Sequence, residues 1–291
     1  MERREAEKPI VLGNVTVYGI DDLEGTTSRL NLSRLTLAAG EWLTVVGVNG
    51  SGKSTLARLL AGIEPERMIG TLERGFAGEN SCPIVLQQPK AQLFGETPRE
   101  EVMFALEWRG ISAEHILEKV DQALHRVGLT ALADEPWDRL SGGQQQLAAV
   151  SAATECDAPL LVLDEATSML DEQNRDTVLR TAREFHARGS AVVWVTQRLD
   201  ELEPDSRVVA VGEGSIIFDG TGREFMYGSA GDEQGEDGPI SPCLRAGLRL
   251  PYLAEFAIEL RRQGKIADPL PMTDREWRKV WESGGIGETT K

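Results

Sequence analysis

The sequence is poor in cysteine and in long apolar runs. Its three cysteines, Cys82, Cys156 and Cys243, lie far apart and form no Cys-x-x-Cys pair. This spacing indicates neither a disulfide framework nor a zinc site, and it suits a reducing cytosol. The apolar runs, such as AVVWV at 191–195, are far shorter than the roughly 18 residues that cross a bilayer. We therefore expect a chain that crosses no membrane by itself but can dock on a protein that does.

Positive charge is the second deficit. Lysine and arginine number 31 against 47 aspartates and glutamates, so the formal net charge is −16. A general nucleic-acid binder needs a cationic face, and we therefore predict no nucleic-acid partner. The charged start of the chain, MERREAEKPIV, has no apolar core after it, so we expect it not to be a secretory signal.

What the sequence does have is a regular alternation of strand-like and helix-like segments. Short apolar runs suited to buried strands lie at 42–46, 83–87, 159–163 and 191–195. Helical patterns lie at 55–63, 98–109, 113–127, 144–156 and 172–188. Further strands are expected at 10–20 and 30–37, and a hairpin at 208–220. The alternation predicts an α/β fold with a mostly parallel central sheet.

The composition changes near residue 228. Residues 229–239 are rich in glycine and acidic side chains, which predicts a linker. Two short amphipathic helices are expected within 240–291. One helix face would carry Leu253, Phe256, Ala257 and Leu260. The second helix would open with a capping box and continue with an apolar stripe: Thr273 and Glu276, then Trp277, Val280 and Trp281. Helices this short bury little surface alone, so we expect them to pack on the main domain or on a partner.

The stretch GVNGSGKST, residues 47–55, matches the phosphate-loop pattern G-x-x-x-x-G-K-[ST]. Its residues are Gly47, Val48, Asn49, Gly50, Ser51, Gly52, Lys53, Ser54 and Thr55. Glycines let successive backbone N–H groups face phosphate oxygens, and the helix that follows adds its N-terminus. We expect Lys53 to reach the β- and γ-phosphates and the Ser54 hydroxyl to ligate Mg²⁺. A chance match is the alternative, which the strand before and the helix after disfavour.

Two later stretches add chemistry. LSGGQQQL at 140–147 is a Ser-Gly-Gly turn that opens a helix, a second group of converging N–H donors suited to a γ-phosphate. The simplest reason for it is a nucleotide held by another subunit. LLVLDEATSMLD at 160–171 is an apolar strand that ends in Asp164 and Glu165. Asp164 would hold Mg²⁺ through water and Glu165 would act as general base on the attacking water; a pair that only caps the turn is the alternative.

In this order the motifs resemble those of ATP-binding cassette (ABC) ATPases. Walker A lies at 47–55, the Q-loop at Gln87, the signature at 140–144, Walker B at 160–165 and the D-loop at 168–171. The resemblance implies a P-loop NTPase domain at 8–228, with a helical subdomain at about 88–158, an antiparallel β subdomain and a small C-terminal helical extension at 240–291.

The resemblance also implies a head-to-tail dimer that closes on two ATP molecules. Gln87 would act at the catalytic centre and on Mg²⁺. The signature would contact in trans the ATP of the other subunit through Ser141, Gly142, Gly143 and Gln144.

The Q-loop segment at 84–106 indicates a narrower group within the ABC ATPases. It resembles that of the energising ATPases of energy-coupling factor (ECF) transporters at Gln87, Pro89, Gln92, Leu93 and Phe94. The tail at 246–264 also resembles theirs, which helps to hold the dimer. This implies a peripheral subunit on the cytoplasmic face of the cell membrane that hydrolyses ATP with Mg²⁺ to energise import of a vitamin or a transition-metal ion.

Three partners follow from the resemblance: a homologous ATPase subunit, a transmembrane coupling subunit and a substrate-binding membrane subunit. The last would recognise the substrate, so this chain does not encode it. Glu100 and Glu101 would pair with basic residues of the coupling subunit; an ordinary acidic helix start is the alternative.

Three positions remain open. Gln197 stands where the family has a histidine. A glutamine amide can orient water but cannot carry a proton away, so we hypothesise a weakened site on this chain's own phosphate loop and a heterodimer with a faster partner site. Leu147 replaces the usual arginine after the signature, which would loosen packing or ion pairing there. Tyr18 is a candidate for adenine stacking, with an ordinary strand tyrosine as the alternative.

Two other functions compete. A soluble ABC ATPase acting on nucleic acid or ribosomes often has two nucleotide domains or a basic insert, and this chain has neither. A partner subunit that binds nucleotide with little hydrolysis is favoured by Gln197 and opposed by Glu165.

Overall fold

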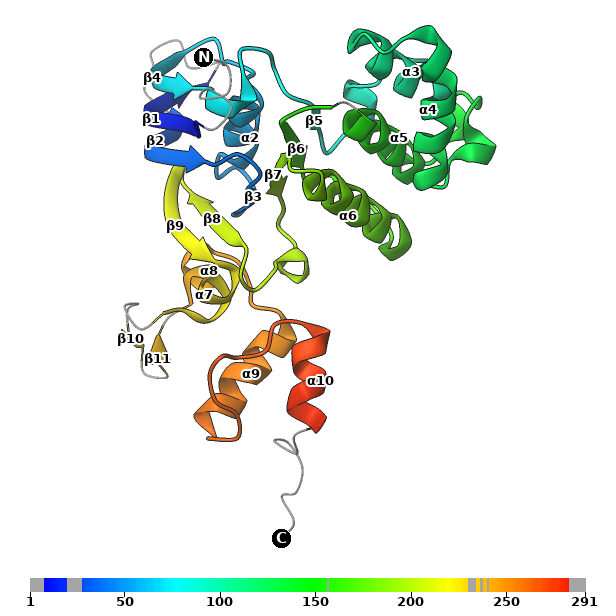
Figure 1. Cartoon of the computed structure of the whole chain (residues 1–291). Coiled ribbons are helices and arrows are strands. Elements are labelled where there is room, and N and C mark those ends of the chain that lie inside the picture. The colour runs from blue at the N-terminus through cyan, green and yellow to red at the C-terminus, as the bar shows by residue number, and fades with distance from the viewer. Residues whose placement is uncertain are drawn as a thin grey trace.

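The computed structural model describes residues 8–19, 28–155, 157–229, 234–235, 238–239 and 241–282. A central sheet has a helical lobe on one side, a small antiparallel sheet on the other, and C-terminal helices below (Figure 1). Cys156, the ends of the chain and most of the predicted linker lie outside the described residues.

The central sheet has six strands in the order β5-β6-β7-β3-β8-β9. They are β3 (Trp42–Val46), β5 (Ile84–Val85), β6 (Leu160–Asp164), β7 (Ala191–Val195), β8 (Arg207–Gly212) and β9 (Ser215–Thr221). All neighbours pair in parallel except β8 and β9, which form the expected antiparallel hairpin. Every residue of β6 and β7 is buried, which is why these strands are continuous apolar runs in the sequence. The strand expected at 83–87 is shorter than predicted.

The second sheet is antiparallel, with the order β2-β1-β4. It contains β1 (Ile10–Tyr18), β2 (Ser28–Leu37) and β4 (Met68–Glu73). Strand β4 was not predicted from the sequence. No residue of β4 is fully buried, so this edge strand lacks the apolar alternation by which strands are found.

Helices α2 (Lys53–Ala61), α5 (Gly142–Glu155) and α6 (Glu172–Ala187) lie next to the central sheet, and α3 (Pro98–Trp108) and α4 (Ala113–Arg126) pack on α5 in the helical lobe (Figure 1). Local signals set their ends. The Thr97 hydroxyl accepts from the Glu100 N–H ahead of α3, and the Asp171 carboxylate accepts from the Asn174 N–H ahead of α6. Helix α2 ends at Gly62, whose φ of 84° is left-handed.

One apolar cluster joins the helical lobe to the central sheet. Val102 of α3, Val120 of α4 and Leu147 of α5 belong to the same buried group as Leu161 and Trp194 of the sheet. Leu147, where the family has an arginine, is therefore part of this core. Because the cluster is continuous and close-packed, we expect a displacement of the helical lobe to move the strands that carry the candidate site.

Short elements complete the chain. The 3-10 turns are η1 (Gly75–Ala77), η2 (Pro89–Ala91), η3 (Thr130–Leu132), η4 (Trp137–Arg139) and η5 (Leu199–Glu201). The remaining strands are β10 (Gln234–Gly235) and β11 (Gly238–Pro239), which pair with each other inside the predicted linker. The remaining helices are α7 (Gly222–Tyr227), α8 (Pro242–Arg245), α9 (Tyr252–Arg262) and α10 (Asp274–Glu282).

The C-terminal helices continue the core of the main sheet by way of α7. Trp277 of α10 and Ala257 of α9 share a buried cluster with Val46 and Val208 of the sheet. The capping box before α10 is confirmed, because the Glu276 N–H donates to the Thr273 hydroxyl and the Thr273 N–H to the Glu276 carboxylate, both at 3.2 Å.

The predicted apolar face of α9 is partly wrong. Ala254 is buried there, whereas Leu253 is 40% exposed. Helix α9 is thus turned so that Leu253 lies at the edge of the buried face. On α10, Trp277 is buried but Trp281 is exposed, so only part of the predicted stripe faces the core.

Candidate functional site

The phosphate loop curls between β3 and α2 as the glycine pattern predicts. Gly47 and Gly52 have φ values of 149° and 106°, which side chains disfavour. A Cβ on Gly47 would lie 2.2 Å from the Val211 carbonyl oxygen, and one on Gly52 would lie 2.7 Å from that of Arg29. Helix α2 begins at Lys53 with no acidic residue in its first turn and no side-chain cap. The N–H groups at this helix start are therefore suited to an anion.

Lys53 lies inside this loop with only 4% of its surface exposed. Its Nζ donates to the Val48 carbonyl oxygen at 3.1 Å and lies 3.3 Å from Glu165 Oε1. A buried ammonium needs partners, and here they are one loop carbonyl and one carboxylate. Lys53, predicted from the sequence to bind phosphate, and Glu165, predicted to act as general base, are thus in direct contact.

Asp164 ends β6 and is 5% exposed. Burial raises the pKa of its carboxyl, against the lowering effect of a hydrogen bond from the Ser54 hydroxyl. Its Oδ1 is buried and, within the described part of the chain, accepts no hydrogen bond. An unsatisfied buried acceptor beside a hydroxyl fits a magnesium site, since Mg²⁺ prefers oxygen ligands.

Metal binding here would depend on the nucleotide. The described residues contain no group of three or more His, Cys, Asp or Glu side chains arranged to hold a metal. Asp164 and the Ser54 hydroxyl would therefore hold Mg²⁺ together with phosphate oxygens, as is usual for this ion.

Glu165 follows with a left-handed backbone, φ 52°. That conformation costs a residue with a side chain roughly 1 kcal/mol or more, and such strain gathers at functional sites. Its N–H donates to the Val195 carbonyl oxygen at 3.0 Å, which ties it to the end of β7. The carboxylate accepts a hydrogen bond from the Gln197 side chain at 2.7 Å.

Gln197 lies between the phosphate loop and the end of the Walker B motif. Its Nε2 donates both to Glu165 Oε1 and to Asn49 Oδ1, each at 2.7 Å. Both donor positions of the amide are therefore used, one on the candidate base and one on the phosphate loop. The structure brings Gln197, Glu165, Lys53 and Asn49 together, as their positions in the motifs predict.

Gln87 lies farther along the same edge. Its amide donates to the Ser168 hydroxyl at 3.3 Å, on the loop after Glu165. The neighbouring Leu86 carbonyl accepts from the Gln146 amide of α5 at 3.1 Å. The Q-loop is thus tied to the D-loop and to the signature helix, and the role of Gln87 at Mg²⁺ stays a prediction.

The signature turn opens α5 and is closed by its own side chains. The Ser141 N–H donates to the Gln144 amide oxygen at 2.8 Å, and the Gln144 N–H donates to the Ser141 hydroxyl at 3.3 Å. Gly142 and Gly143 lie in the first turn, so α5 begins two residues before the start expected at 144.

A cleft of about 500 Å³ lies beside this turn. Its walls include Gln87, Ser141, Gly142, Gly143, Leu170 and Asn174, and residues 47–55 take no part in it. The cleft joins signature, Q-loop and D-loop, whereas the phosphate loop belongs to another part of the surface.

Tyr18 ends β1 and is half-buried. Its ring and Thr55 line a pocket of about 230 Å³, and the Arg67 guanidinium carbon lies 5.4 Å from the ring centroid. The proximity to Thr55 suits a nucleoside, but adenine stacking on Tyr18 stays a prediction.

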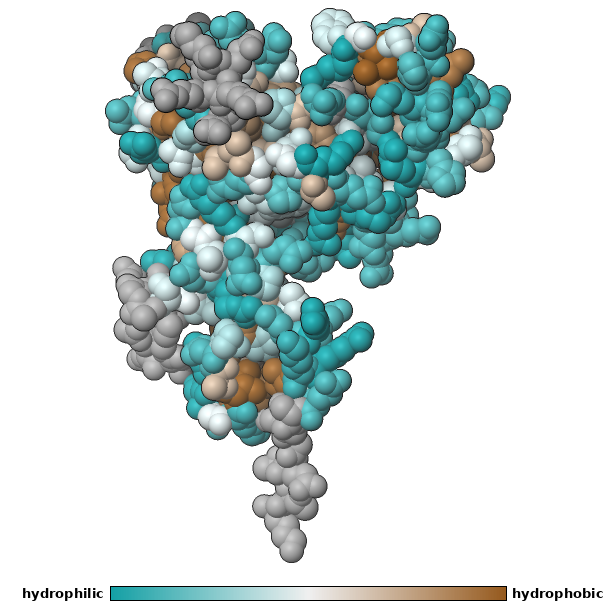
Figure 2. Space-filling model, viewed as in Figure 1, coloured by the Kyte–Doolittle hydropathy of each residue, from teal (hydrophilic) through white to brown (hydrophobic). Residues whose placement is uncertain are grey.

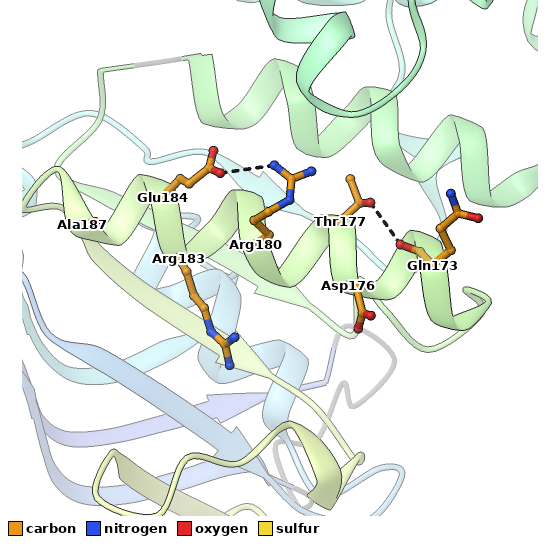
Figure 3. Close-up of a pocket in the computed structure, with 7 residues that line it drawn as sticks. All are labelled: Gln173, Asp176, Thr177, Arg180, Arg183, Glu184 and Ala187. Atoms are coloured by element: carbon orange, nitrogen blue, oxygen red, sulfur yellow. Dashed lines mark hydrogen bonds and ion pairs between the residues drawn. The ribbon is translucent and has the colours of Figure 1, made fainter. Parts of the chain in front are cut away.

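A larger hollow, about 700 Å³, lies along α6 and contains none of the predicted site residues. The side chains there project from one helix (Figure 3). Arg180 pairs with Glu184 at 3.2 Å one turn away, and its other nitrogen donates to the Arg126 carbonyl. Such pairing is typical of a solvated helix face.

Taken together, the fold and the phosphate-binding elements define an ABC-type ATPase: a P-loop core, an antiparallel β subdomain and a helical subdomain that carries the signature. Among the helices that the structure describes, none combines the length and apolarity required to traverse a lipid bilayer.

Comparisons with known proteins specify the family. Residues 30–168 match the ABC transporter family. The energy-coupling factor transporter ATP-binding protein EcfA1 of Lacticaseibacillus paracasei is 37% identical over 82% of this chain and 85% of its own length. EcfA of Enterococcus faecium is 32% identical over 91% of this chain and 94% of its own. The solved structure of cbiO1 from Clostridium perfringens, part of the ABC transporter complex cbiONQ, is similar with a TM-score of 0.61 and 27% identity, covering 75% of this chain and 90% of that one.

The chain therefore belongs to the ABC transporter ATPases, in the group of energy-coupling factor transporter ATP-binding proteins. It binds ATP and couples its hydrolysis to transport, which confirms the family and the activity expected from the motifs.

Proposed function

We propose that this chain pairs head to tail with a related ATPase subunit and hydrolyses Mg²⁺-ATP to energise import of a vitamin or a transition-metal ion. The assembly would lie on the cytoplasmic face of the cell membrane. The observation that carries the proposal is the separation of two half-sites on one chain. The phosphate loop meets Glu165, while the signature turn opens a different cleft. A second subunit is the simplest way to complete both.

Each residue of the phosphate-loop half-site has a definite task. The N–H groups of residues 47–55 bind the phosphates, and Lys53 exchanges its Val48 and Glu165 contacts for phosphate oxygens. Ser54 and Asp164 would hold Mg²⁺, which when bound neutralises charge on the β- and γ-phosphates. Glu165 takes a proton from the attacking water, and the Gln197 amide orients that water.

The hydrogen bonds of Gln197 support a weakened site on this chain. Its amide is engaged by Glu165 and Asn49, and unlike an imidazole it cannot accept and pass on a proton. The partner's site is completed by the signature turn of this chain, whose Ser-Gly-Gly sequence is intact. We therefore expect the partner's site to turn over faster.

The Q-loop lobe supports a membrane partner through its exposed apolar side chains. The side chain of Trp108 on α3 is 92% exposed, and that of Phe94 is nearly as exposed. Glu101, by contrast, accepts from the N–H groups of Phe94 and Gly95 at 2.8 and 2.9 Å, and Glu100 from that of Glu96 at 2.8 Å. These carboxylates organise the loop before α3, which favours the helix-start interpretation over pairing with the coupling subunit.

The C-terminal helices support the ATPase–ATPase contact. Tyr252 and Trp281 are exposed at the two ends of an aromatic row that continues through Phe256 and Trp277, with ring centroids 5.4 to 6.5 Å apart. The lower lobe in Figure 2 shows an apolar area where α9 and α10 lie in Figure 1. Exposed aromatic side chains are favoured at interfaces, so we assign this row to the dimer.

Purification of the full-length tagged chain from detergent-extracted native membranes tests the proposal. We expect an integral membrane protein and a second ATPase subunit to co-purify, with ATPase activity in the assembly. Recovery only from the cytosolic fraction, bound to nucleic acid or ribosomes, would support the competing ABC ATPase function instead. An assembly whose activity is indifferent to Glu165→Gln would identify this chain as a binding partner without hydrolysis of its own.

A further inference from the structure

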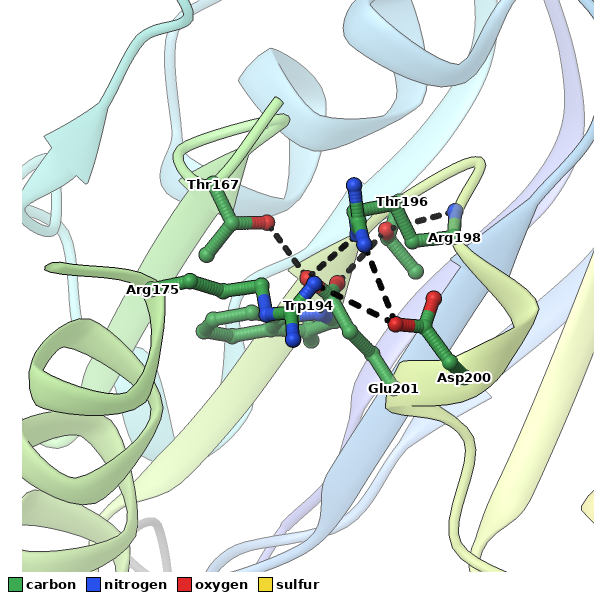
Figure 4. A network of polar contacts seen from close by, with 7 residues as sticks. All are labelled: Thr167, Arg175, Trp194, Thr196, Arg198, Asp200 and Glu201. Carbon is green, nitrogen blue, oxygen red and sulfur yellow. Dashed lines mark hydrogen bonds and ion pairs between the residues drawn. The ribbon is translucent and has the colours of Figure 1, made fainter. Parts of the chain in front are cut away.

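Glu201 is a buried acidic residue outside all the motifs. It ends the 3-10 turn η5, and its side chain is 1% exposed. Oε1 accepts from the Thr167 hydroxyl at 2.7 Å. Oε2 accepts from the Trp194 indole N–H at 2.9 Å and from the Thr196 hydroxyl at 2.7 Å. In Figure 4 these three donors converge on the one carboxylate.

The donors of this network come from the two segments that carry the hydrolytic residues. Thr167 lies two residues after Glu165, and Thr196 immediately precedes Gln197. Glu201 therefore links the loop after β6 to the end of β7. We call this link, formed by Glu201, Thr167, Trp194 and Thr196, the clip. The clip lies beside the 2.7 Å hydrogen bond between Gln197 and Glu165.

An outer ring of charges surrounds the clip. Arg198 Nε lies 3.6 Å from Glu201 Oε1, and the Arg198 N–H donates to the Thr196 hydroxyl at 3.0 Å. Asp200 pairs with Arg198 at 3.1 Å and with Arg175 of α6 at 3.3 Å. The ring extends the connection from η5 to the helix that follows the D-loop.

A side chain with acceptor oxygens is the group that such a position requires. Three donors converge, and an ionised carboxylate accepts from all of them while donating to none. An apolar side chain would leave the Thr167, Trp194 and Thr196 donors without their acceptor in a buried position. A buried charge that packing alone does not need is more readily explained by a requirement for fixed geometry.

We propose that Glu201 is a positioning residue for ATP hydrolysis: it holds Gln197 and Glu165 at the separation that their joint action on water requires. The inference rests on the proposed hydrolysis at this chain's own phosphate loop. A displacement of about 1 Å can reduce a catalysed rate by about a hundredfold, so loosening this clip acts on turnover rather than on ATP binding.

The test uses the full chain assembled with its native partner. Own-site turnover is the share of phosphate release that Glu165→Gln abolishes. We expect Glu201→Ala to lower the kcat of that share at least tenfold, with KM for ATP within about twofold of wild type. Glu201→Gln keeps an acceptor for Trp194 and Thr196, and the Thr167 hydroxyl can turn to accept, so this variant should retain at least about half the rate.

Two further variants separate geometry from stability. Thr167→Val removes one donor with little change in shape, and we expect about a threefold to tenfold loss of kcat. Arg183→Gln breaks the exposed ion pair with Glu203 and serves as the control that leaves kcat unchanged. Melting temperatures are measured for all variants. Glu201→Ala and Thr167→Val with lowered melting temperatures but near-normal own-site kcat would overturn the proposal and leave Glu201 a structural residue.

Failure of the proposed function gives a different result. If Glu165→Gln abolishes no phosphate release, hydrolysis at this chain's loop is refuted. Amide hydrogen exchange on the full chain with Mg²⁺-ATP then decides the inference. Faster exchange of the Glu165 and Thr196 amides in Glu201→Ala, with unchanged exchange of the amides within β6, would support the clip. Unchanged exchange at both amides would contradict it.

Discussion

The phosphate loop and the signature turn of this chain differ in how far their polar groups are paired within the chain itself. In the phosphate loop, Lys53 and Glu165 pair at 3.3 Å, and Gln197 joins both sides of the site. In the signature turn, Ser141 and Gln144 cap each other beside an open cleft. The polar side chains of the first region are thus paired with one another, whereas under the proposed function the second contributes its helix N-terminus to the nucleotide of another subunit.

This contrast predicts which site each substitution affects. Changes in the loop region should act on the nucleotide that this chain holds, and changes in the signature should act on the partner's.

The largest effect is expected from Glu165→Gln. The amide cannot take the proton of water, so own-site hydrolysis should fall by about 10²- to 10⁴-fold while ATP affinity stays within about twofold. Phosphate release is measured in an assembled pair that also carries Ser141→Arg, which silences the partner's site. Glu114→Gln on exposed α4 is the matched control. Retention of more than a tenth of the rate would exclude Glu165 as the base.

Asp164→Asn should separate activity from stability. Since burial raises the pKa of Asp164, the folded state binds this proton more tightly than the unfolded chain does. The contribution of Asp164 to stability therefore falls as pH rises through the interval between the two pKa values. At pH 7 without nucleotide, Asp164→Asn should melt at a higher temperature than wild type.

If Asp164 holds Mg²⁺ as proposed, the same variant should lose about a hundredfold in Mg²⁺-dependent hydrolysis. Asp176→Asn on the α6 surface controls for the change of charge. A lower melting temperature together with normal hydrolysis would contradict both roles assigned to Asp164.

Ser141→Arg should act in the opposite half of the pair. A bulky cation in the signature turn blocks the approach of the partner's γ-phosphate, and total turnover should fall at least about tenfold. ATP binding to this chain's own loop, measured by equilibrium dialysis of the full-length chain, should not change. Ser112→Arg places the same side chain at the exposed start of α4 and should leave turnover intact. Weakened binding at the chain's own loop would show that the two regions are not separate.

The smallest effect is expected from Gln197→His. An imidazole can donate to Glu165 and also exchange a proton, so own-site turnover should rise about twofold to fivefold. The rate should acquire a pH dependence near about 6.5, the ordinary pKa of histidine. Gln122→His on α4 is the control. Unchanged or lower turnover would count against a site weakened by Gln197.

The same contrast explains what the sequence could reveal. The phosphate loop could be predicted from the sequence because its backbone requires particular residues. At Gly47 and Gly52 the neighbouring backbone leaves no room for a Cβ. Asp164 and Glu165 follow a fully buried strand, so their place at the strand end could be predicted as well.

Other features depend on contacts between distant residues. Strand β4 is an exposed edge with no apolar pattern. Leu253 lies at the edge of the buried face of α9, because the rotation of that helix depends on the elements it packs against. Glu201 was missed since its partners Thr167 and Thr196 become neighbours only when β6 and β7 pair. An acidic residue in a short turn gives no local sign of burial.

The central claim is that one ATP is held between the phosphate loop of one subunit and the signature of the other. The most direct measurement is an experimental structure of the assembled pair carrying Glu165→Gln, with ATP and Mg²⁺. We predict that the Ser141 side chain and the N–H groups of Gly142 and Gly143 donate hydrogen bonds to the γ-phosphate of the nucleotide in the partner's loop. A closed pair in which the Ser141 turn faces solvent, with ATP enclosed by one subunit alone, would contradict it.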